Sequence, residues 1–239
     1  MPDNTCTTDL FPVDIHQQQA LYTAQSIVKV EQQAITELGN NGGYVLMQRA
    51  AAALLKLLQQ QWPAPRTILV YAGSGNNGGD GYLLAALARA SGYDIRLLQH
   101  GDHSRLGTTA KQAASAAAKA GVPLVDEFPD AQLLVDALFG TGLNRPLDKP
   151  TRALITQINQ SGKPVLAVDI PSGLSADSGA AMPVAVKAST TLSFIGIKSG
   201  LLMQDGLDHC GELWLSPLQL DSALAGTKPA CQSIAAGSL

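Results

Sequence analysis

The run Gly73-Ser74-Gly75-Asn76-Asn77-Gly78-Gly79-Asp80-Gly81 joins an apolar segment to a segment of helical composition. The apolar segment, residues 67–72, is typical of a buried parallel strand, and residues 82–90 are rich in alanine and leucine. Glycine adopts positive φ without penalty and lets the backbone approach a ligand closely. The N–H groups at the start of the following helix attract anions such as phosphate. This run therefore predicts a strand-to-helix turn that can bind a phosphorylated ligand.

A formal Gly-x-Gly-x-x-Gly lies within this turn, but alone it is weak evidence for a dinucleotide site, and a tight turn without a ligand is the simpler alternative. A Rossmann unit also needs an acidic residue near the end of its second strand. The expected second strand, residues 94–98, continues into Gln99 and His100 instead. The Asp80 carboxylate would repel a pyrophosphate, although Asp80 is equally well explained as a helix N-cap. These features argue against an ordinary Rossmann cofactor turn.

The composition describes a chain of 239 residues with 46% hydrophobic residues, which fits one α/β domain or at most two small ones. Lysine and arginine total 16 against 19 acidic residues, so a nucleic-acid partner is not expected. Cys6, Cys210 and Cys231 form neither a zinc spacing nor a disulfide framework. No apolar run approaches the ~20 residues that span a bilayer, and no secretory signal is present. We therefore expect a cytoplasmic protein without a membrane association.

The order of the segments predicts the fold class. Residues 1–21 are polar and without periodicity, and we expect a loose N-terminal arm. Thr23 is the expected N-cap of a first helix, a second helix covers residues 44–61, and both precede the first strand. Strands alternating with helices predict a three-layer αβα sandwich, with a Rossmann-like, mainly parallel sheet and two extra N-terminal helices. The domain is expected over residues 22–220, with a tail or linker stub over 221–239. The strands are expected at residues 67–72, 94–98, 123–125, 132–136, 164–169, 190–194 and 211–215, and further helices at 108–120 and 151–160.

Two aspartates stand at the ends of two of these apolar strands, Asp136 and Asp169, and each is followed by a glycine-containing turn. Each could simply fix its own turn. Because ligands bind beyond the carboxyl ends of parallel strands, we instead expect one cleft. Its oxygen-rich motifs, without histidine or cysteine, suit a hard cation rather than zinc or copper. The residues that we expect to line this cleft are Asn77, Asp80, Asp136, Asp169 and Ser172.

Four stretches carry a resemblance to a known family: Gly75-Asn-Asn-Gly-Gly-Asp-Gly81, Val135-Asp-Ala-Leu-Phe-Gly-Thr-Gly-Leu143, Val168-Asp-Ile-Pro-Ser-Gly-Leu174 and Lys198-Ser-Gly-Leu-Leu202. Together with the helical Tyr22–Glu31 and Leu46–Ala50 segments, they resemble the YjeF N-terminal domain family, the NAD(P)HX epimerases. The resemblance covers about residues 22–220. The chain departs from the family pattern at Ser74, Gln48 and Ala51, and the latter two lie in a helix that the resemblance links to a homodimer.

The resemblance implies a function in nicotinamide nucleotide repair. Members of this family interconvert the R and S forms of NADHX and NADPHX, which are hydrated at nicotinamide C6. An ADP- or ATP-dependent dehydratase, as a separate partner or a fused domain, then repairs one epimer. The implied potassium ligands are Asn77, Asp136 and Ser172. The implied cofactor-binding residues are Asn76, Asn77, Gly78, Gly79, Asp80, Gly140, Thr141, Gly142, Leu143, Asn144, Arg145, Pro146 and Asp169.

The hydroxyl at C6 is on a carbon next to the ring nitrogen, so epimerisation by hydroxide loss or by ring opening needs a positioned acid or base. We expect Asp169 to be that residue, with Asp136 and partial burial tuning it. Lys198 is the reserve candidate, but it could equally be a surface or phosphate-binding lysine. The alternatives are a non-catalytic nucleotide-binding or protein-interaction module on the same fold. An NAD-dependent dehydrogenase is less favoured because the second-strand acid and a histidine acid/base are missing.

Overall fold

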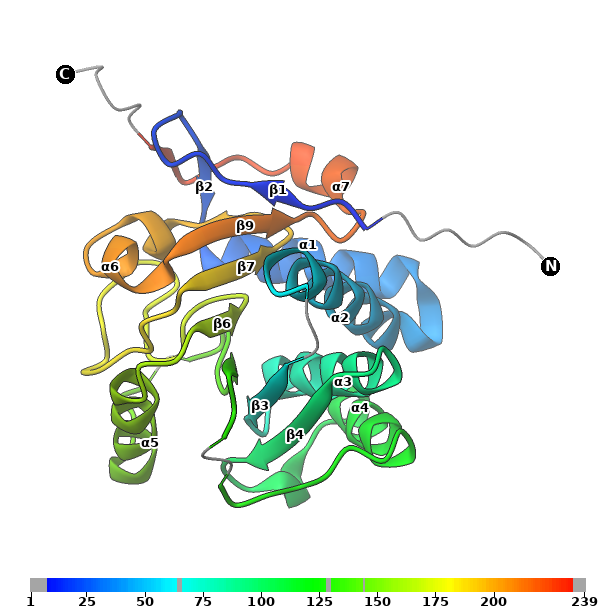
Figure 1. The fold of residues 1–239 in the computed structure, drawn as a ribbon. Coiled ribbons are helices and arrows are strands. Elements are labelled where there is room, and N and C mark those ends of the chain that lie inside the picture. Colours follow the sequence, from blue (N-terminus) through cyan, green and yellow to red (C-terminus); the bar gives the residue numbers. More distant parts are fainter. Residues whose placement is uncertain (1–7, 64–65, 128–129, 144, 234–239) are drawn as a thin grey trace.

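The computed structural model describes residues 8–63, 66–127, 130–143 and 145–233, and its centre is a seven-stranded sheet (Figure 1). The strands lie in the order β1-β9-β7-β6-β5-β3-β4. All neighbouring pairs are parallel except β1, which runs antiparallel to β9. The strands of this sheet are β1 (Phe11–Pro12), β3 (Thr67–Ala72), β4 (Asp94–Gln99), β5 (Leu133–Ala137), β6 (Val165–Val168), β7 (Thr190–Phe194) and β9 (Glu212–Ser216).

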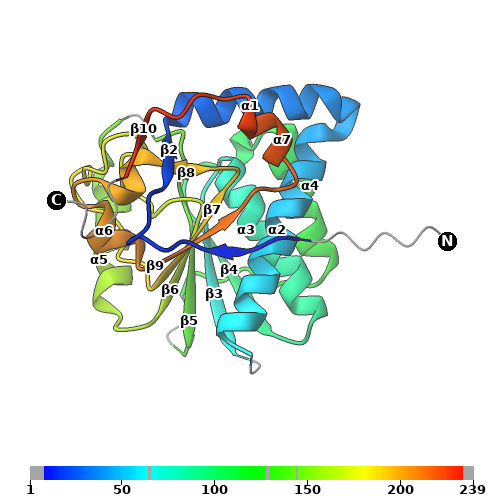
Figure 2. The same cartoon turned by 90° about the horizontal axis from the view of Figure 1, so that it is seen from above.

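Helices cover both faces of the sheet, which confirms the predicted α/β sandwich: α5 and α6 lie on one side, and α2, α3 and α4 on the other (Figure 2). The first helix begins as expected, because the Thr23 hydroxyl accepts a hydrogen bond from the Ser26 N–H at 3.1 Å. The α-helices are α1 (Ala24–Glu37), α2 (Gly42–Gln61), α3 (Asn76–Ala90), α4 (Thr108–Lys119), α5 (Lys149–Gln160), α6 (Gly206–Cys210) and α7 (Asp221–Ala225). The 3₁₀ turns are η1 (Gly39–Asn41), η2 (His103–Arg105) and η3 (Ser199–Leu202).

Strand β3 shows how the sequence separates the two faces of the sheet. Its side chains alternate, as in any strand, so that Ile68 and Val70 join the apolar core beneath α2, α3 and α4. Leu69 and Tyr71 join the core on the other face, with Ile155 of α5. Because both faces are covered, the strand is an unbroken apolar run rather than an alternating one.

The two ends of the described chain form strands, so the expectation of a loose N-terminal arm is wrong for residues 8–21. The predicted tail or linker stub contains α7 and β10 within residues 221–233. Strand β1 extends the main sheet. Strand β2 (Ala20–Tyr22) lies between β10 (Cys231–Gln232) and β8 (Ile197–Lys198) in a second, three-stranded sheet (Figure 2). Within this sheet Tyr22 pairs with Lys198, and Leu21 pairs with Cys231. Strand β2 therefore lies directly beside the segment that carries Lys198, and β10 lies on the other side of β2.

One predicted strand is reduced to a single bridge. Residues 123–125 contribute only the contact of Leu124 with Leu97, and the Leu124 side chain is exposed. A run of three residues with one apolar side chain at the surface is too short to form a full edge strand. Helix α3 begins at Asn76 rather than after the glycine run, so residues 76–81 are helical and not part of the turn as expected. The remaining predicted strands and helices are present within two residues of the expected boundaries. Among the described residues, no helix is long and apolar enough to cross a membrane.

The strand order of the sheet reverses direction at β3, and this reversal determines where the candidate site lies. From β3 the chain passes first to β4 on one side and later to β5 on the other. In open parallel sheets such a reversal leaves a crevice beyond the carboxyl ends of the two strands, because their following loops turn in opposite directions. Here those loops are residues 73–75 after β3 and residues 138–143 and 145 after β5.

Candidate active site

A cleft of about 620 Å³ lies at this reversal point. Its floor is formed by the loops that follow β3, β5 and β6 at the edge of the sheet, and one wall comes from α1 and α2. Most of the predicted cofactor-binding residues line it, namely Asn76, Asn77, Asp80, Gly140, Thr141, Gly142, Leu143, Arg145 and Asp169. The predicted residues Gly78, Gly79 and Pro146 do not line it, and Asn144 lies outside the described residues.

The glycines of the first loop allow close packing rather than side-chain contact with a ligand. A Cβ on Gly78 would lie on the carbonyl oxygen of Gly73, and a Cβ on Gly79 would lie 2.5 Å from the Met47 Cε. The tight turn lets α3 begin at Asn76, with Gly75 as its N-cap and without a capping side chain. The alternative of Asp80 as N-cap is therefore wrong. The uncapped helix start faces the cleft with N–H groups that have no intrahelical acceptor, which makes it an anion-binding end.

Asp136 and Ser172 form a closed hydrogen-bonded unit beneath the cleft. Asp136 is 0% exposed and Ser172 is 1% exposed, so the expectation that both line the cleft is wrong. The Ser172 hydroxyl donates to Asp136 Oδ1 at 2.6 Å, and the Ser172 N–H donates to Oδ2 at 2.8 Å. Burial raises the pKa of Asp136 to about 6, although the hydrogen bonds from Ser172 and Leu138 act in the opposite direction.

Asn77 lies between this unit and the open cleft. Its side chain is buried, it lines the cleft, and its Nδ2 atom has no hydrogen-bond partner among the described residues. Gly140 packs against it, since a Cβ there would lie 3.3 Å from Asn77 Oδ1. Phe139, which precedes Gly140, donates its N–H to the Ser172 hydroxyl at 2.9 Å. A buried amide without a partner is costly, so this position is suited to a ligand or ion.

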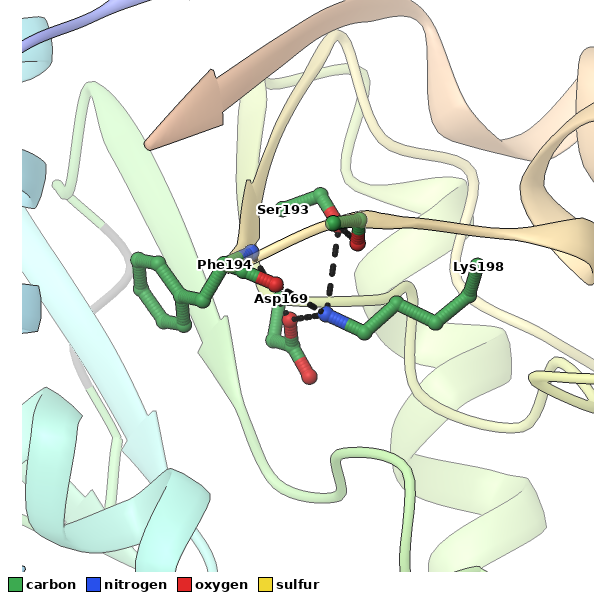
Figure 3. Close-up of polar contacts among 5 residues, drawn as sticks. Asp169, Ser193, Phe194 and Lys198 are labelled. Carbon is green, nitrogen blue, oxygen red and sulfur yellow. Dashed lines mark hydrogen bonds and ion pairs between the residues drawn. The ribbon is translucent and has the colours of Figure 1, made fainter. Parts of the chain in front are cut away.

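Asp169 and Lys198 form an ion pair in the cleft (Figure 3). Lys198 Nζ donates to Asp169 Oδ1, to the Phe194 carbonyl at 2.8 Å and to the Ser193 hydroxyl at 3.3 Å. The three protons of the ammonium thus have three acceptors. Asp169 Oδ1 also accepts the Phe194 N–H at 3.0 Å, whereas Oδ2 receives no hydrogen bond from the described residues. The pair therefore holds one carboxylate oxygen and leaves the other available.

The backbone at this pair is strained in two places. Asp169 has φ 67°, and the Ile170 N–H bonds the Val168 carbonyl at 2.8 Å across it, as in a γ-turn. Ile195 repeats the arrangement, with φ 67° and a Gly196-to-Phe194 bond of 2.7 Å. Such conformations cost of order 1–3 kcal/mol each and persist only where the surrounding structure enforces them. Both residues line the cleft, so the strain lies at the candidate active site.

The carboxylates that interact with Asp169 are not the ones expected. Asp136 was expected beside it, but burial is the cause that raises the pKa of Asp136, and the charge of Asp169 does not contribute. Burial raises the pKa of Asp80 well above its usual range, and the charges of Asp169 and Glu31 raise it further. Burial also raises the pKa of Glu31, with the charge of Asp169 raising it and that of Lys198 lowering it. The site thus contains three mutually repelling carboxyl groups and one lysine.

The chain is similar to proteins of one known family. A family model described as "YjeF-related protein N-terminus" matches residues 43–200. The chain belongs to this family. One relative, from Limosilactobacillus fermentum, is named NAD(P)H-hydrate epimerase; it is 36% identical over 199 residues, which are 82% of this chain and 95% of the relative. Another, from Coxiella burnetii, is named bifunctional NAD(P)H-hydrate repair enzyme Nnr and is 39% identical over 208 residues.

These relatives differ in length. The Coxiella alignment covers 85% of this chain but 42% of the relative, so the chain spans less than half of that bifunctional protein. The crystal structure of the yeast protein ynu0, YNL200c, matches with a TM-score of 0.69 at 20% identity, over 77% of this chain and 84% of that one. At this identity the match shows a shared fold. It supports the assignment of the sheet and its flanking helices to the YjeF fold.

Sequence reasoning missed Glu31 as a site residue of this YjeF-family chain. The Tyr22–Glu31 segment contributed to the resemblance, but no role was assigned to Glu31. An acidic residue on an amphipathic helix has the pattern of a solvent-facing position. Only the packing of α1 against the rest of the cleft shows that Glu31 is partly buried and faces inward. The histidines stayed outside the site as expected: His100 bonds Thr151 at 2.7 Å, and His103 bonds Tyr82 at 2.9 Å.

Proposed function

We propose that this chain is an NAD(P)H-hydrate epimerase that interconverts the R and S forms of NADHX and NADPHX at nicotinamide C6. The observation that carries the proposal is Asp169: one carboxylate oxygen is fixed by Lys198 and Phe194, while the other is available in a cleft beside an uncapped helix N-terminus. This arrangement places a helix N-terminus that can bind phosphate beside a carboxylate that can act as an acid or a base. The names of the relatives agree with that chemistry.

The substrate's pyrophosphate is assigned to the start of α3, where the N–H groups of the first turn and the helix dipole favour negative charge. Arg145, exposed at the rim, supplies a cation for the same phosphates. The hydrated ring then extends toward Asp169. Asp80 lies in the same cleft, and its raised pKa reduces the repulsion that an ionised carboxylate would exert on a phosphate.

The chemistry requires a proton to reach the departing C6 hydroxyl and a proton to leave the incoming water. We assign Asp169 Oδ2 to one of these two proton transfers. Lys198 acts through Asp169: its ammonium protons are all occupied by acceptors, so it orients the carboxylate rather than donating a proton. The γ-turn at Asp169 directs the side chain from the strand end into the cleft.

A potassium ion fits the Asn77, Asp136 and Ser172 group that the family resemblance implies. All three offer oxygen atoms, which hard cations prefer. Asp136 is fully buried, and no cationic side chain pairs with it among the described residues. The ion would supply the missing positive charge. The loop of residues 138–143 contacts this group, since Phe139 donates its N–H to the Ser172 hydroxyl and Gly140 packs against Asn77. These three residues would hold the ion.

A dehydratase that consumes one epimer is the functional partner that this reaction requires, because epimerisation alone does not remove the hydrated nucleotide. The bifunctional relative supports such a partner as a fused domain. A homodimer, a cytoplasmic location and the absence of a membrane association stay predictions. The preference between NADHX and NADPHX is open to the same assay that tests the function.

The proposed function is tested by incubating a single purified epimer of NADHX or NADPHX with the protein and separating the epimers by chromatography. We expect rapid approach to the equilibrium mixture, and loss of that acceleration in Asp169→Asn. Adding an S-specific dehydratase should then consume the R epimer only when this protein is present. Tight binding of the nucleotide without faster epimerisation would favour the alternative of a non-catalytic binding module.

A further inference from the structure

Inversion of the configuration at C6 requires proton transfer on both faces of the nicotinamide ring. In the hydroxide-loss route, an acid protonates the C6 hydroxyl, the C–O bond breaks with its electron pair, water leaves, and the nitrogen lone pair forms a C6=N bond. Water then attacks C6 from the opposite face, the π electrons return to nitrogen, and a base takes the surplus proton. One proton enters on one face and one leaves on the other, so a carboxylate on one side serves only half of the reaction.

Five charged residues line the cleft in the described part of the chain, which limits the candidates for the second group: Glu31, Asp80, Arg145, Asp169 and Lys198. Arginine does not release its proton in proteins. The ammonium protons of Lys198 are all engaged. Glu31 and Asp80 remain as partners for Asp169.

Glu31 and Asp80 come from different parts of the cleft. Asp80 is on α3, in the helix whose N-terminus is assigned to the phosphates. Glu31 is on α1, in the wall formed by the N-terminal helices, whereas Asp169 is at the edge of the sheet (Figure 2). We propose that Glu31 is the second acid/base residue of this cleft and faces the hydrated ring from the wall opposite Asp169. This inference rests on the proposed epimerase function.

The carboxyl groups of Glu31 and Asp169 come from different elements that line the cleft, α1 and the loop after β6. Their charges interact, but no hydrogen bond joins Glu31 to Asp169 in the described structure. The unpartnered amide of Asn77, buried and lining the same cleft, independently indicates that this space receives a ligand. Burial raises the pKa of Glu31 above its usual value, and the charge of Asp169 raises it further. The charges of both carboxyl groups also act on Asp80, which lines the same cleft.

Glu31→Gln removes the titratable carboxyl group but retains the size of the side chain. We expect kcat for epimerisation to fall about 10²–10⁴-fold, the usual contribution of general acid–base catalysis, with KM within about threefold of the wild type. One limb of the wild-type pH profile of kcat should disappear in this variant. The groups that face Glu31 across the cleft, Asp80, Asp169 and Lys198, remain to shape the other limb.

The matched control is Glu37→Gln, because Glu37 is on the same helix, is exposed and does not line the cleft. It should retain wild-type kcat. Binding of unmodified NADPH, followed by fluorescence, reports whether each variant still folds. A Glu31→Gln protein that binds NADPH and keeps kcat within twofold of the wild type would overturn the inference, as would a raised KM with unchanged kcat.

Glu31→Asp decides the question if Glu31→Gln does not fold. It keeps the carboxyl group one methylene further from the ring, so we expect reduced kcat with both pH limbs retained and one displaced. Wild-type kcat with an unchanged profile would contradict the proposal. Failure of the epimerase function is distinguishable, since the wild-type protein itself would then not accelerate epimerisation. Loss of the same pH limb in Asp80→Asn, with Glu31→Gln active, would assign the second group to Asp80 instead.

Discussion

Replacement of Lys198 by methionine tests whether the ion pair with Asp169 is a rigid unit of the fold. Lys198 is 0% exposed, and methionine fills similar space without the charge. The variant leaves the Phe194 carbonyl and the Ser193 hydroxyl without their donor and leaves Asp169 without its cation. Removing one partner of a buried pair costs about 3–5 kcal/mol. Because the Asp169 side chain is 13% exposed and can recruit water, we expect a loss near the lower bound, about 3 kcal/mol in the free energy of unfolding.

Urea denaturation, followed by the fluorescence of the buried Trp214, measures this loss. The double variant Asp169→Asn/Lys198→Met should lose less than the sum of the single variants, with a coupling energy of about 1–3 kcal/mol. Lys29→Met is the control, since Lys29 is exposed on α1, and it should stay within about 0.5 kcal/mol of the wild type. A loss below about 1 kcal/mol in Lys198→Met, together with no coupling, would refute the reasoning. The kcat of Lys198→Met should also fall because Asp169 loses its orientation.

Further predictions concern the buried carboxylate and the glycine turn. Burial raises the pKa of Asp136 from 3.8 to about 6, so its contribution to stability is complete below pH 3.8 and is lost as the pH rises through 6. In potassium-free buffer the wild type should lose about 1.5 kcal/mol more of its unfolding free energy between about pH 5 and 8 than Asp136→Asn, by urea titration. Saturating potassium should remove that difference if the ion binds there; equal pH slopes in both proteins would contradict the assignment. Gly78→Ala should lower stability by about 1–3 kcal/mol or more, because its Cβ meets the Gly73 carbonyl, whereas Gly75→Ala, with open space around it, should cost under about 1 kcal/mol; equal melting temperatures would argue against the tight turn.

The sequence predicts most of the fold because its long elements carry strong signals. The apolar runs of β3 and β6 are typical of buried strands between covering helices. The short terminal strands were missed because β1, β2 and β10, at two or three residues each, are too brief to show a period. Their pairing depends on neighbours far along the chain, such as Tyr22 with Lys198.

The sequence motifs predicted which loops form the site, but not which of their side chains are buried and which face the cleft. Asp136 ends an apolar strand and reads like Asp169, yet it is sealed beneath the cleft by Ser172, whereas Asp169 faces into it. A strand covered on both faces gives no alternation from which the direction of its last side chain can be read. Glu31 was hidden for a related reason: a charged residue on an amphipathic helix indicates solvent unless a second element is known to cover it.

The proposed function requires that the hydrated nicotinamide ring binds between Asp169 and the N-terminal helices, with its phosphates at the start of α3. A crystal structure with bound NADPHX, or with NADP as a substitute, tests it most directly. We expect nicotinamide C6, or its hydroxyl, within hydrogen-bond reach of Asp169 Oδ2, about 2.6–3.2 Å or through one water. A nicotinamide ring bound outside the cleft, or phosphates placed away from Asn76 and Asn77, would contradict the account.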